Sequence, residues 1–159
     1  MELSTLLTTI FLSFLPISEL RGAIPYAVAR GVPLPAAFLL AGACNVLVAP
    51  VAFLFLGTLH GLFRRWPFYA RLFDRIVERA RIKVGPAVEK YGYWGLLVFV
   101  AVPLPVTGAW TGALGAWILG LRRRKASLYI ALGVCIAGVI VSAVVGLGIG
   151  ALSFLIKRI

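Results

Sequence analysis

Four long apolar stretches dominate the pattern of hydrophobic and polar positions along the chain. They run from Leu3 to about Ala29, from Leu34 to about Phe63, from Trp94 to about Leu121 and from Ser127 to Ile156. A helix needs about 20 apolar residues to cross a bilayer, so each stretch is long enough to do so. Taken alone, this pattern predicts four membrane-spanning helices.

The positions of the basic residues conflict with four simple crossings. The linker 64–92 carries eight lysines and arginines, and Arg122 to Lys125 are four basic residues in a row. Such clusters in short loops favour the cytoplasmic face, so both segments are expected on that side. A single crossing by residues 94–121 would place them on opposite sides. They share a face only if the third stretch enters the membrane and returns.

Two interruptions mark the places where the chain is expected to turn back. The segment Pro103 to Pro105 leaves an arm of nine residues before it and one of about 16 after it. In the first stretch, the charged segment 16–21 separates residues 3–15 from residues 22–29. Every arm is shorter than a crossing requires. We therefore predict that both stretches form re-entrant helical hairpins.

The two halves of the chain resemble each other. A shift of 86 positions aligns Gly22 with Gly108, and a shift of 91 positions aligns Gly42 with Gly133. Each half is then a hairpin followed by one crossing. Because a single crossing lies between the two hairpins, the second half enters from the opposite face, which makes the repeat inverted.

The predicted fold is therefore an all-α integral membrane protein in one domain, residues 1–159. Within the linker, residues 67–83 place apolar side chains at helical spacing with arginines around the other face. This pattern predicts a cytoplasmic, interfacial amphipathic helix, and Gly85-Pro86 is expected to end it. The predicted parts are repeat 1 at residues 1–63, the linker at 64–92 and repeat 2 at 93–159.

Composition agrees with a membrane environment. Hydrophobic residues make up 62% of the chain and charged residues 13%, against about 45 to 50% and about 25% in soluble domains. The net charge of +11 is high enough for the binding of nucleic acid. The basic residues cluster beside apolar stretches, however, which favours contact with an anionic lipid surface. No nucleic-acid partner is therefore expected. No nucleophile paired with a base, phosphate loop or metal-ligand spacing is visible in the sequence. We therefore expect no enzyme activity, metal or cofactor.

The segment Ser18 to Pro25 holds a carboxylate and a guanidinium where the first hairpin reaches into the membrane. Such charges are costly at that depth and usually functional. In a functional role, Ser18 caps the returning helix, Arg21 binds an anionic group through its forked donors, and Glu19 takes up and releases a proton. The alternative is that Glu19 and Arg21 only neutralise each other or reach the membrane surface.

The segment Pro103 to Gly112 is the matching tip of the second hairpin. Thr107 is expected to cap its returning helix, whose free N–H groups favour an anion in the same cavity. The alternative is that proline and glycine only turn and pack the chain here. In the first crossing helix, Asn45 is expected to make an interhelical hydrogen bond rather than a substrate contact. The candidate residues for substrate binding and proton coupling are Glu19, Arg21, Gly22, Pro25, Asn45, Pro103, Pro105, Thr107, Gly108 and Thr111, and no catalytic residue is assigned.

Both tips resemble those of the small multidrug export family of prokaryotic membrane proteins. The likeness lies in Glu19-Leu20-Arg21-Gly22-Ala23-Ile24-Pro25 and in Pro103-Leu104-Pro105-Val106-Thr107-Gly108-Ala109-Trp110-Thr111-Gly112. Tyr91-Gly92 is similar to the entry of the second hairpin in the wider DedA-type superfamily. The resemblance implies paired re-entrant hairpins in a multi-pass protein of the prokaryotic plasma or inner membrane, and proton-dependent movement of polyprenyl-phosphate lipids.

The predicted function is a proton-coupled transporter or flippase for an anionic lipid or amphiphile, with protons and anionic membrane lipids as partners. Export of amphipathic drugs is the alternative within the same class. A non-transporting membrane scaffold, whose basic segment recruits a partner, is the alternative from a different class. The spacing of Gly108 and Gly112 allows close helix contact, either within one subunit or in a homodimer.

Overall fold

The computed structural model describes residues 2–103 and 107–156, with side chains through Gly148, and all regular elements in that part of the chain are helices. The expectation of an all-α protein is therefore confirmed for the described residues. In chain order the helices are α1 (Leu3–Phe14), α2 (Glu19–Ala29), α3 (Leu34–Thr58), α4 (His60–Phe63), α5 (Pro67–Tyr91), α6 (Tyr93–Ala101), α7 (Ala109–Ile118) and α8 (Arg123–Ile156).

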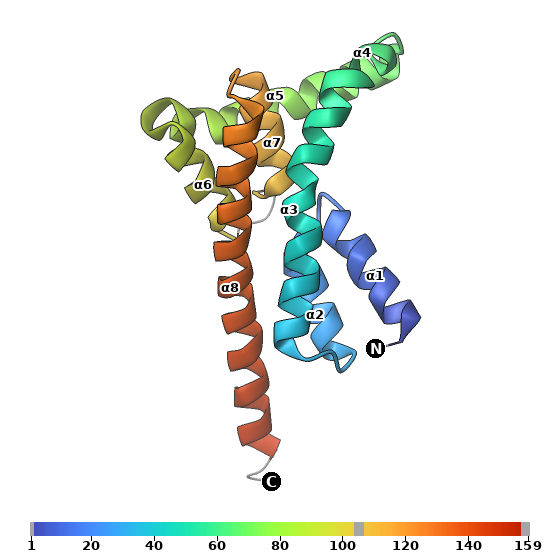
Figure 1. The fold of residues 1–159 in the computed structure, drawn as a ribbon, viewed down its shortest axis with the longest axis vertical. Helices are drawn as coiled ribbons and strands as arrows, with labels where there is room; N and C mark the ends of the chain where they lie inside the picture. Colours follow the sequence, from blue (N-terminus) through green and yellow to red (C-terminus); the bar gives the residue numbers. More distant parts are fainter. Residues whose placement is uncertain (1, 104–106, 157–159) are drawn as a thin grey trace.

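Two long helices form the body of the molecule. Helix α3 and residues 123–148 of α8 are long and apolar enough to cross a membrane, with mean hydropathies of 2.3 and 2.7. The 25 residues of α3 extend about 37 Å at 1.5 Å per residue, which exceeds the roughly 30 Å hydrocarbon core of a bilayer. The two helices contact each other and run in opposite directions (Figure 1).

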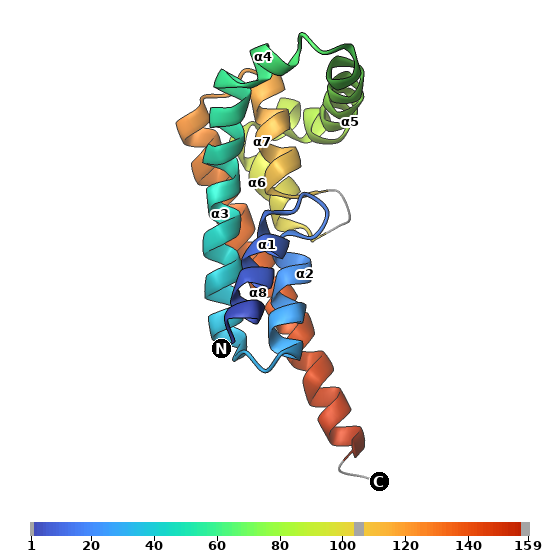
Figure 2. The same cartoon turned by 90° about the vertical axis from the view of Figure 1, so that its right-hand side faces the viewer.

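The first and third apolar stretches each fold as two short helices. Helices α1 and α2 have 12 and 11 residues, and α6 and α7 have nine and ten. At 1.5 Å per residue, each is about 14 to 18 Å long, roughly half the thickness of a bilayer core. The two pairs extend from opposite ends of the molecule, and their tips meet near its middle, beside α3 and α8 (Figures 1 and 2). Neither stretch forms one continuous crossing helix.

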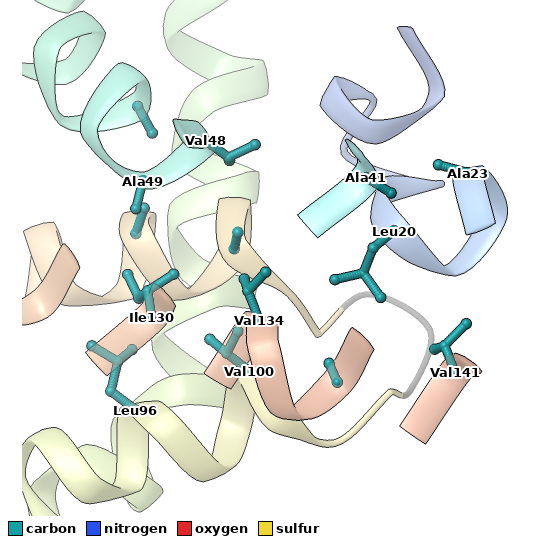
Figure 3. Packing of buried hydrophobic residues seen from close by; sticks show 14 of the residues in the cluster. Leu20, Ala23, Ala41, Val48, Ala49, Leu96, Val100, Ile130, Val134 and Val141 are labelled. Atoms are coloured by element: carbon teal, nitrogen blue, oxygen red, sulfur yellow. The ribbon is translucent and has the colours of Figure 1, made fainter. Parts of the chain in front are cut away.

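Small residues and interlocking side chains allow the helices to pack closely. Figure 3 shows Leu96 beside Ile130 and Val100 beside Val134, which pair α6 with α8, and all four belong to the main buried apolar cluster. A Cβ atom at Gly133 would lie 2.8 Å from the Leu97 carbonyl oxygen. Only glycine therefore lets these two helix backbones approach so closely.

Glycine at position 112 allows the same kind of contact inside the second helix pair. A Cβ atom there would lie 2.7 Å from Val100 Cγ2. Of the two glycines in the predicted spacing, Gly112 thus makes a close contact within the chain, between α6 and α7.

Helix α5 lies across one end of the molecule (Figures 1 and 2). The prediction that this helix stops at Gly85-Pro86 was wrong. It continues through Gly85-Pro86 to Tyr91, and Gly92 terminates it with a left-handed φ of 58°. The reason is tertiary packing, because Val84 fits against Gly115 of α7 and the Ala87 carbonyl contacts Gly95 of α6. These contacts compensate for the backbone hydrogen bond that Pro86 cannot donate.

The first half of α5 keeps the amphipathic character that the sequence predicts. Phe73 and Val77 pack against a small cluster that includes Leu114 of α7. Phe68 and Leu72 are exposed. A helix with basic residues and exposed apolar side chains is suited to a lipid interface.

Helix α4 forms the joint between α3 and α5. The His60 ring is buried and contacts Phe73 and Trp117, with ring centroids 4.1 and 5.5 Å away. Its Nδ1 atom lies 3.1 Å from the Tyr69 hydroxyl. Burial is the main cause that lowers the pKa of His60, and the nearby Arg64 guanidinium adds to it.

Candidate functional site where the two hairpin tips meet

Glu19 stands at the start of α2 in an unusual backbone conformation. Its φ is 49°, which makes it the one non-glycine residue with positive φ in the described part of the chain. A left-handed conformation of this kind is strained for a residue with a Cβ atom, and such strain tends to accumulate at functional sites. Despite its charge, the side chain is only 5% exposed.

The Glu19 carboxylate caps the start of α7 in the other helix pair. Oε2 accepts a hydrogen bond from the backbone N–H of Ala109, and Oε1 accepts one from that of Trp110, both at 3.3 Å. These are the first two residues of α7, and the N–H groups at a helix start have no partner inside the helix. The partial positive charge of the helix end also favours an anion there. Glu19 therefore fills the anion-binding end of a helix 90 positions further along the chain.

Gly108 makes room for this contact. A Cβ atom at this position would lie 2.6 Å from both Cδ and Oε1 of Glu19, and closer still to Oε2. No side chain larger than hydrogen fits while the carboxylate stays in place. The requirement is one of space, because the Gly108 backbone is extended and open to any residue.

Arg21 reaches across to the second tip as well. Its Nη2 atom donates to the Thr107 hydroxyl at 3.1 Å, and that hydroxyl donates to the Val102 carbonyl at 2.8 Å. Thr107 thus connects the guanidinium to the carbonyl of Val102, the C-cap residue of α6. A cation and an anion from the first helix pair therefore contact the second helix pair at neighbouring points.

Two further side chains satisfy the carbonyl groups at the end of α1. The Trp110 indole N–H donates to the Phe14 carbonyl at 2.9 Å, and Asn45 Nδ2 donates to the Ser13 carbonyl at 2.8 Å. The expected interhelical hydrogen bond of Asn45 is confirmed. Trp110 therefore holds both Glu19, through its backbone N–H, and α1, through its ring.

The two capping roles predicted from the sequence were wrong. Ser18 is the N-cap of α2 but makes no side-chain capping hydrogen bond. Gly108, rather than Thr107, is the N-cap of α7. In the second case the physical reason is that the Glu19 carboxylate, an anion, already occupies the first N–H groups of α7, and a charged acceptor makes stronger hydrogen bonds there than a hydroxyl.

The other candidate residues lie at different distances from this meeting point. Gly22 lies in the first turn of α2, where a Cβ atom would collide with the Ser18 side chain. Thr111 lies in the first turn of α7, and Pro103 comes directly after Val102, the C-cap residue of α6. Pro25 lies in the second turn of α2, away from the tip. Pro105 lies outside the described residues.

A sequence profile of one protein family matches residues 19–140, and the family is described as "Putative small multi-drug export protein". The chain belongs to this family. The match covers more than half of the chain and begins at Glu19. Searches of curated proteins and of solved structures gave no match.

Membership of the small multi-drug export family agrees with a membrane protein, as do the two long apolar helices. The family description is one of export rather than catalysis. Within the described ranges, no three histidine, cysteine, aspartate or glutamate side chains come together as a metal-binding group.

Sequence reasoning missed three participants in the site of this small multi-drug export protein. Trp110 was not among the candidates, although a buried indole N–H normally needs a partner. The Ser13 and Phe14 carbonyls were missed because backbone acceptors carry no sequence signature. The position of α1's end beside the tip of α7 was the missing information.

Proposed function

We propose that this chain is a proton-coupled transporter or flippase that moves an anionic lipid or amphiphile, such as a polyprenyl phosphate, across the plasma or inner membrane of a prokaryote. The observation that carries the proposal is the Glu19 carboxylate bound to the first N–H groups of α7. A helix N-terminus is a natural phosphate site. Here a titratable side chain of the protein occupies it.

The proposed topology has α3 and α8 crossing the membrane and both short helix pairs as re-entrant hairpins. Each half of the chain has the order short, short, long, and the two pairs extend from opposite ends (Figure 2). Arg21 and Thr107 are hydrogen-bonded and stand 86 positions apart, the same shift that aligns Gly22 with Gly108 in the sequence. Residues related by a two-fold axis can contact each other only close to that axis. This supports an inverted repeat, an architecture typical of secondary transporters.

Coupling arises from competition for the N–H groups of α7. As a carboxylate, Glu19 holds both donors and excludes a substrate anion. When Glu19 takes up a proton, it becomes neutral and one of its oxygens becomes a hydroxyl donor, so it no longer matches two N–H donors. The donors are then free for a phosphate oxygen of the substrate. Release of the proton restores the carboxylate and expels the anion.

Arg21 supplies the second part of the anion site. Its guanidinium lies at the same tip and contacts Thr107. A planar guanidinium can present two parallel donors to a phosphate group. Together with the N–H groups of Ala109 and Trp110, it would hold an anionic head group on two sides.

Export of amphipathic drugs is the second candidate function, and the family description favours it. A groove of about 650 Å³ between α3 and α8 is lined by apolar side chains such as Leu34, Phe38 and Val139. Such a groove suits the hydrocarbon part of either a lipid or a drug. The charge of the transported compound distinguishes the two functions.

The experiment compares an anionic and a cationic amphiphile in liposomes that contain the purified protein. Geranylgeranyl phosphate movement is followed by the access of externally added phosphatase, and tetraphenylphosphonium uptake is followed in parallel. A pH gradient is imposed in either direction. Proton-dependent movement of the phosphate supports the proposal, uptake of the cation supports drug export, and movement of neither supports a scaffold.

Two substitutions test the roles of the charged residues. Glu19→Gln should fold and still bind the phosphate, yet lose dependence on the pH gradient, because the amide cannot release a proton. Arg21→Lys should weaken binding more than it lowers stability, since an ammonium group cannot form the forked contacts. Glu89→Gln and Arg81→Lys, both on exposed positions of α5, are the matched controls and should leave transport unchanged.

A purely structural role gives a different result. If Glu19 and Arg21 only neutralise each other, each single substitution lowers thermal stability. The double variant Glu19→Gln, Arg21→Gln then recovers both stability and activity. A double variant that transports with its proton dependence intact removes this site from the mechanism.

A further inference from the structure

Helix α1 buries three hydroxyl side chains, whereas several of its large apolar side chains are exposed. Its buried residues are Thr5, Thr9 and Ser13, whereas Leu7 and Phe11 are 57% and 63% exposed. Exposed leucine and phenylalanine side chains suit contact with lipid. Packing alone does not require hydroxyl groups on the buried face, because apolar side chains would fill it equally well. Polar groups placed inside a membrane protein commonly line paths for ions and protons.

The three hydroxyl groups form a regular row along one face of α1. Residues four positions apart lie about 6 Å apart along a helix axis, a gap that one water molecule spans with two hydrogen bonds of about 2.8 Å. Thr9 and Ser13 donate to the carbonyl four residues earlier, both at 2.7 Å. Each hydroxyl oxygen still has capacity to accept from water. Both side chains are fully buried, so entry of water requires a small outward shift of α1.

The row begins at a cavity that contains charged side chains. A space of about 520 Å³ lies where α1 begins and α2 connects to α3, and Glu2, Thr5 and Arg30 are among the residues that line it. Thr5 is thus both the first hydroxyl of the row and part of the cavity wall. The row therefore has a hydrophilic opening at the end of the molecule opposite α5.

The row ends at an unsatisfied polar atom. Asn45 donates to the Ser13 carbonyl, is fully buried, and its Oδ1 atom has no hydrogen-bond partner among the described residues. A buried acceptor without a hydrogen-bond partner commonly marks the site of a bound water molecule. One residue after Ser13, the Phe14 carbonyl accepts from Trp110, whose backbone N–H donates to Glu19. The end of the hydroxyl row, where Asn45 bonds to Ser13, is therefore linked to the buried carboxylate through Phe14 and Trp110.

We propose that Thr5, Thr9, Ser13 and Asn45 form the route by which protons reach Glu19 from the end where α1 begins. This inference rests on the proposed function, because it gives Glu19 its proton supply. Water molecules that bridge the hydroxyls carry hydronium inward, and Asn45 Oδ1 accepts from the innermost water. In the final step hydronium transfers one proton to the Glu19 carboxylate, which leaves water and a neutral carboxylic acid.

The test measures how fast Glu19 is protonated after a drop in pH. The full chain is reconstituted into liposomes through a C-terminal tag, so that the end where α1 begins faces outward, and the carboxylic acid band is followed by rapid infrared difference spectroscopy. Glu19→Gln identifies the band. Thr9→Val and Ser13→Ala should each slow its appearance about tenfold, the factor that corresponds to loss of one hydrogen bond along the route.

Matched variants on the same helix separate the route from general effects of substitution. Thr8→Val alters a neighbouring, half-buried hydroxyl outside the row and should leave the rate unchanged. Thr9→Ser keeps the hydroxyl and should also retain the normal rate. Equal slowing by Thr8→Val and Thr9→Val would show a nonspecific effect and overturn the route.

The remaining outcomes distinguish failure of the route from failure of the proposed function. If the Glu19 band responds to pH but Thr9→Val and Ser13→Ala do not change its rate, the route is wrong and the proton-carrier role of Glu19 stands. If no band that depends on Glu19 responds to pH, the proposed coupling fails, and the route fails with it.

Discussion

Replacing Gly108 by alanine tests the contact between the two helix pairs with a single added carbon atom. The new Cβ atom would lie 2.6 Å from Cδ and Oε1 of Glu19, so the carboxylate has to move. The backbone at position 108 is extended, with φ of 161° and ψ of −171°, and alanine can adopt it. The substitution therefore acts on the carboxylate and leaves the local backbone unchanged.

The expected loss of stability follows from the two hydrogen bonds that the carboxylate makes. A hydrogen bond to a charged group contributes about 1.5 to 3 kcal/mol. Both N–O distances are 3.3 Å, slightly longer than the usual range, so the lower figure applies to each. Gly108→Ala should then lower the free energy of unfolding by about 3 kcal/mol.

The measurement is an unfolding titration with SDS in mixed micelles, compared with Gly42→Ala. Gly42 lies within α3, and a Cβ atom there would meet nothing within 4 Å. Because alanine favours a helix over glycine by about 1 kcal/mol, Gly42→Ala should leave stability unchanged or raise it slightly.

A double-mutant cycle shows whether the loss passes through the carboxylate. In a Glu19→Ala background, the alanine at position 108 meets no carboxylate and should cost little. The coupling energy between the two positions should then be close to the full loss of about 3 kcal/mol. If Gly108→Ala costs the same with and without Glu19, the reasoning is refuted.

Three further predictions concern the end of the molecule where α5 lies. Cysteines that replace Arg75 and Arg123 should react with an impermeant reagent from the same, cytoplasmic side of the membrane. Reaction from opposite sides would instead support a topology with four membrane-spanning helices. Replacing Arg71, Arg75 and Arg79 by glutamine should reduce the dependence of transport on anionic lipid, since each basic residue near such a surface contributes about 1 kcal/mol; complete loss of transport in a folded variant would instead place α5 in the substrate path. Burial lowers the pKa of His60, so the unfolded chain binds a proton more readily than the folded chain. The free energy of unfolding should therefore be highest above about pH 6.5 and should fall as the pH drops below that value. Unfolding titrations at several pH values check this, and His60→Phe should remove the dependence.

The sequence by itself determined that the protein is helical and where the first and third stretches break. The long apolar runs are interrupted by proline and charges at 16–21 and by two prolines at 103–105. These are local patterns, and local patterns govern helix formation. The sequence also singled out Glu19 and Arg21, because charges inside an apolar stretch are conspicuous. It could not place the end of α5, since contacts of Val84 and Ala87 with α6 and α7 outweigh the effect of Gly85-Pro86.

Only the tertiary structure decided which groups meet at the centre. The ends of four short helices carry N–H and carbonyl groups without partners inside the helix, and no sequence pattern states which side chain will satisfy them. Packing of the two pairs against α3 and α8 places Glu19 at the start of α7 and Trp110 at the end of α1. These partners lie 90 to 96 positions apart, so local sequence carries no signal of their contact. The choice depends on which helix ends are brought within hydrogen-bond distance by the fold.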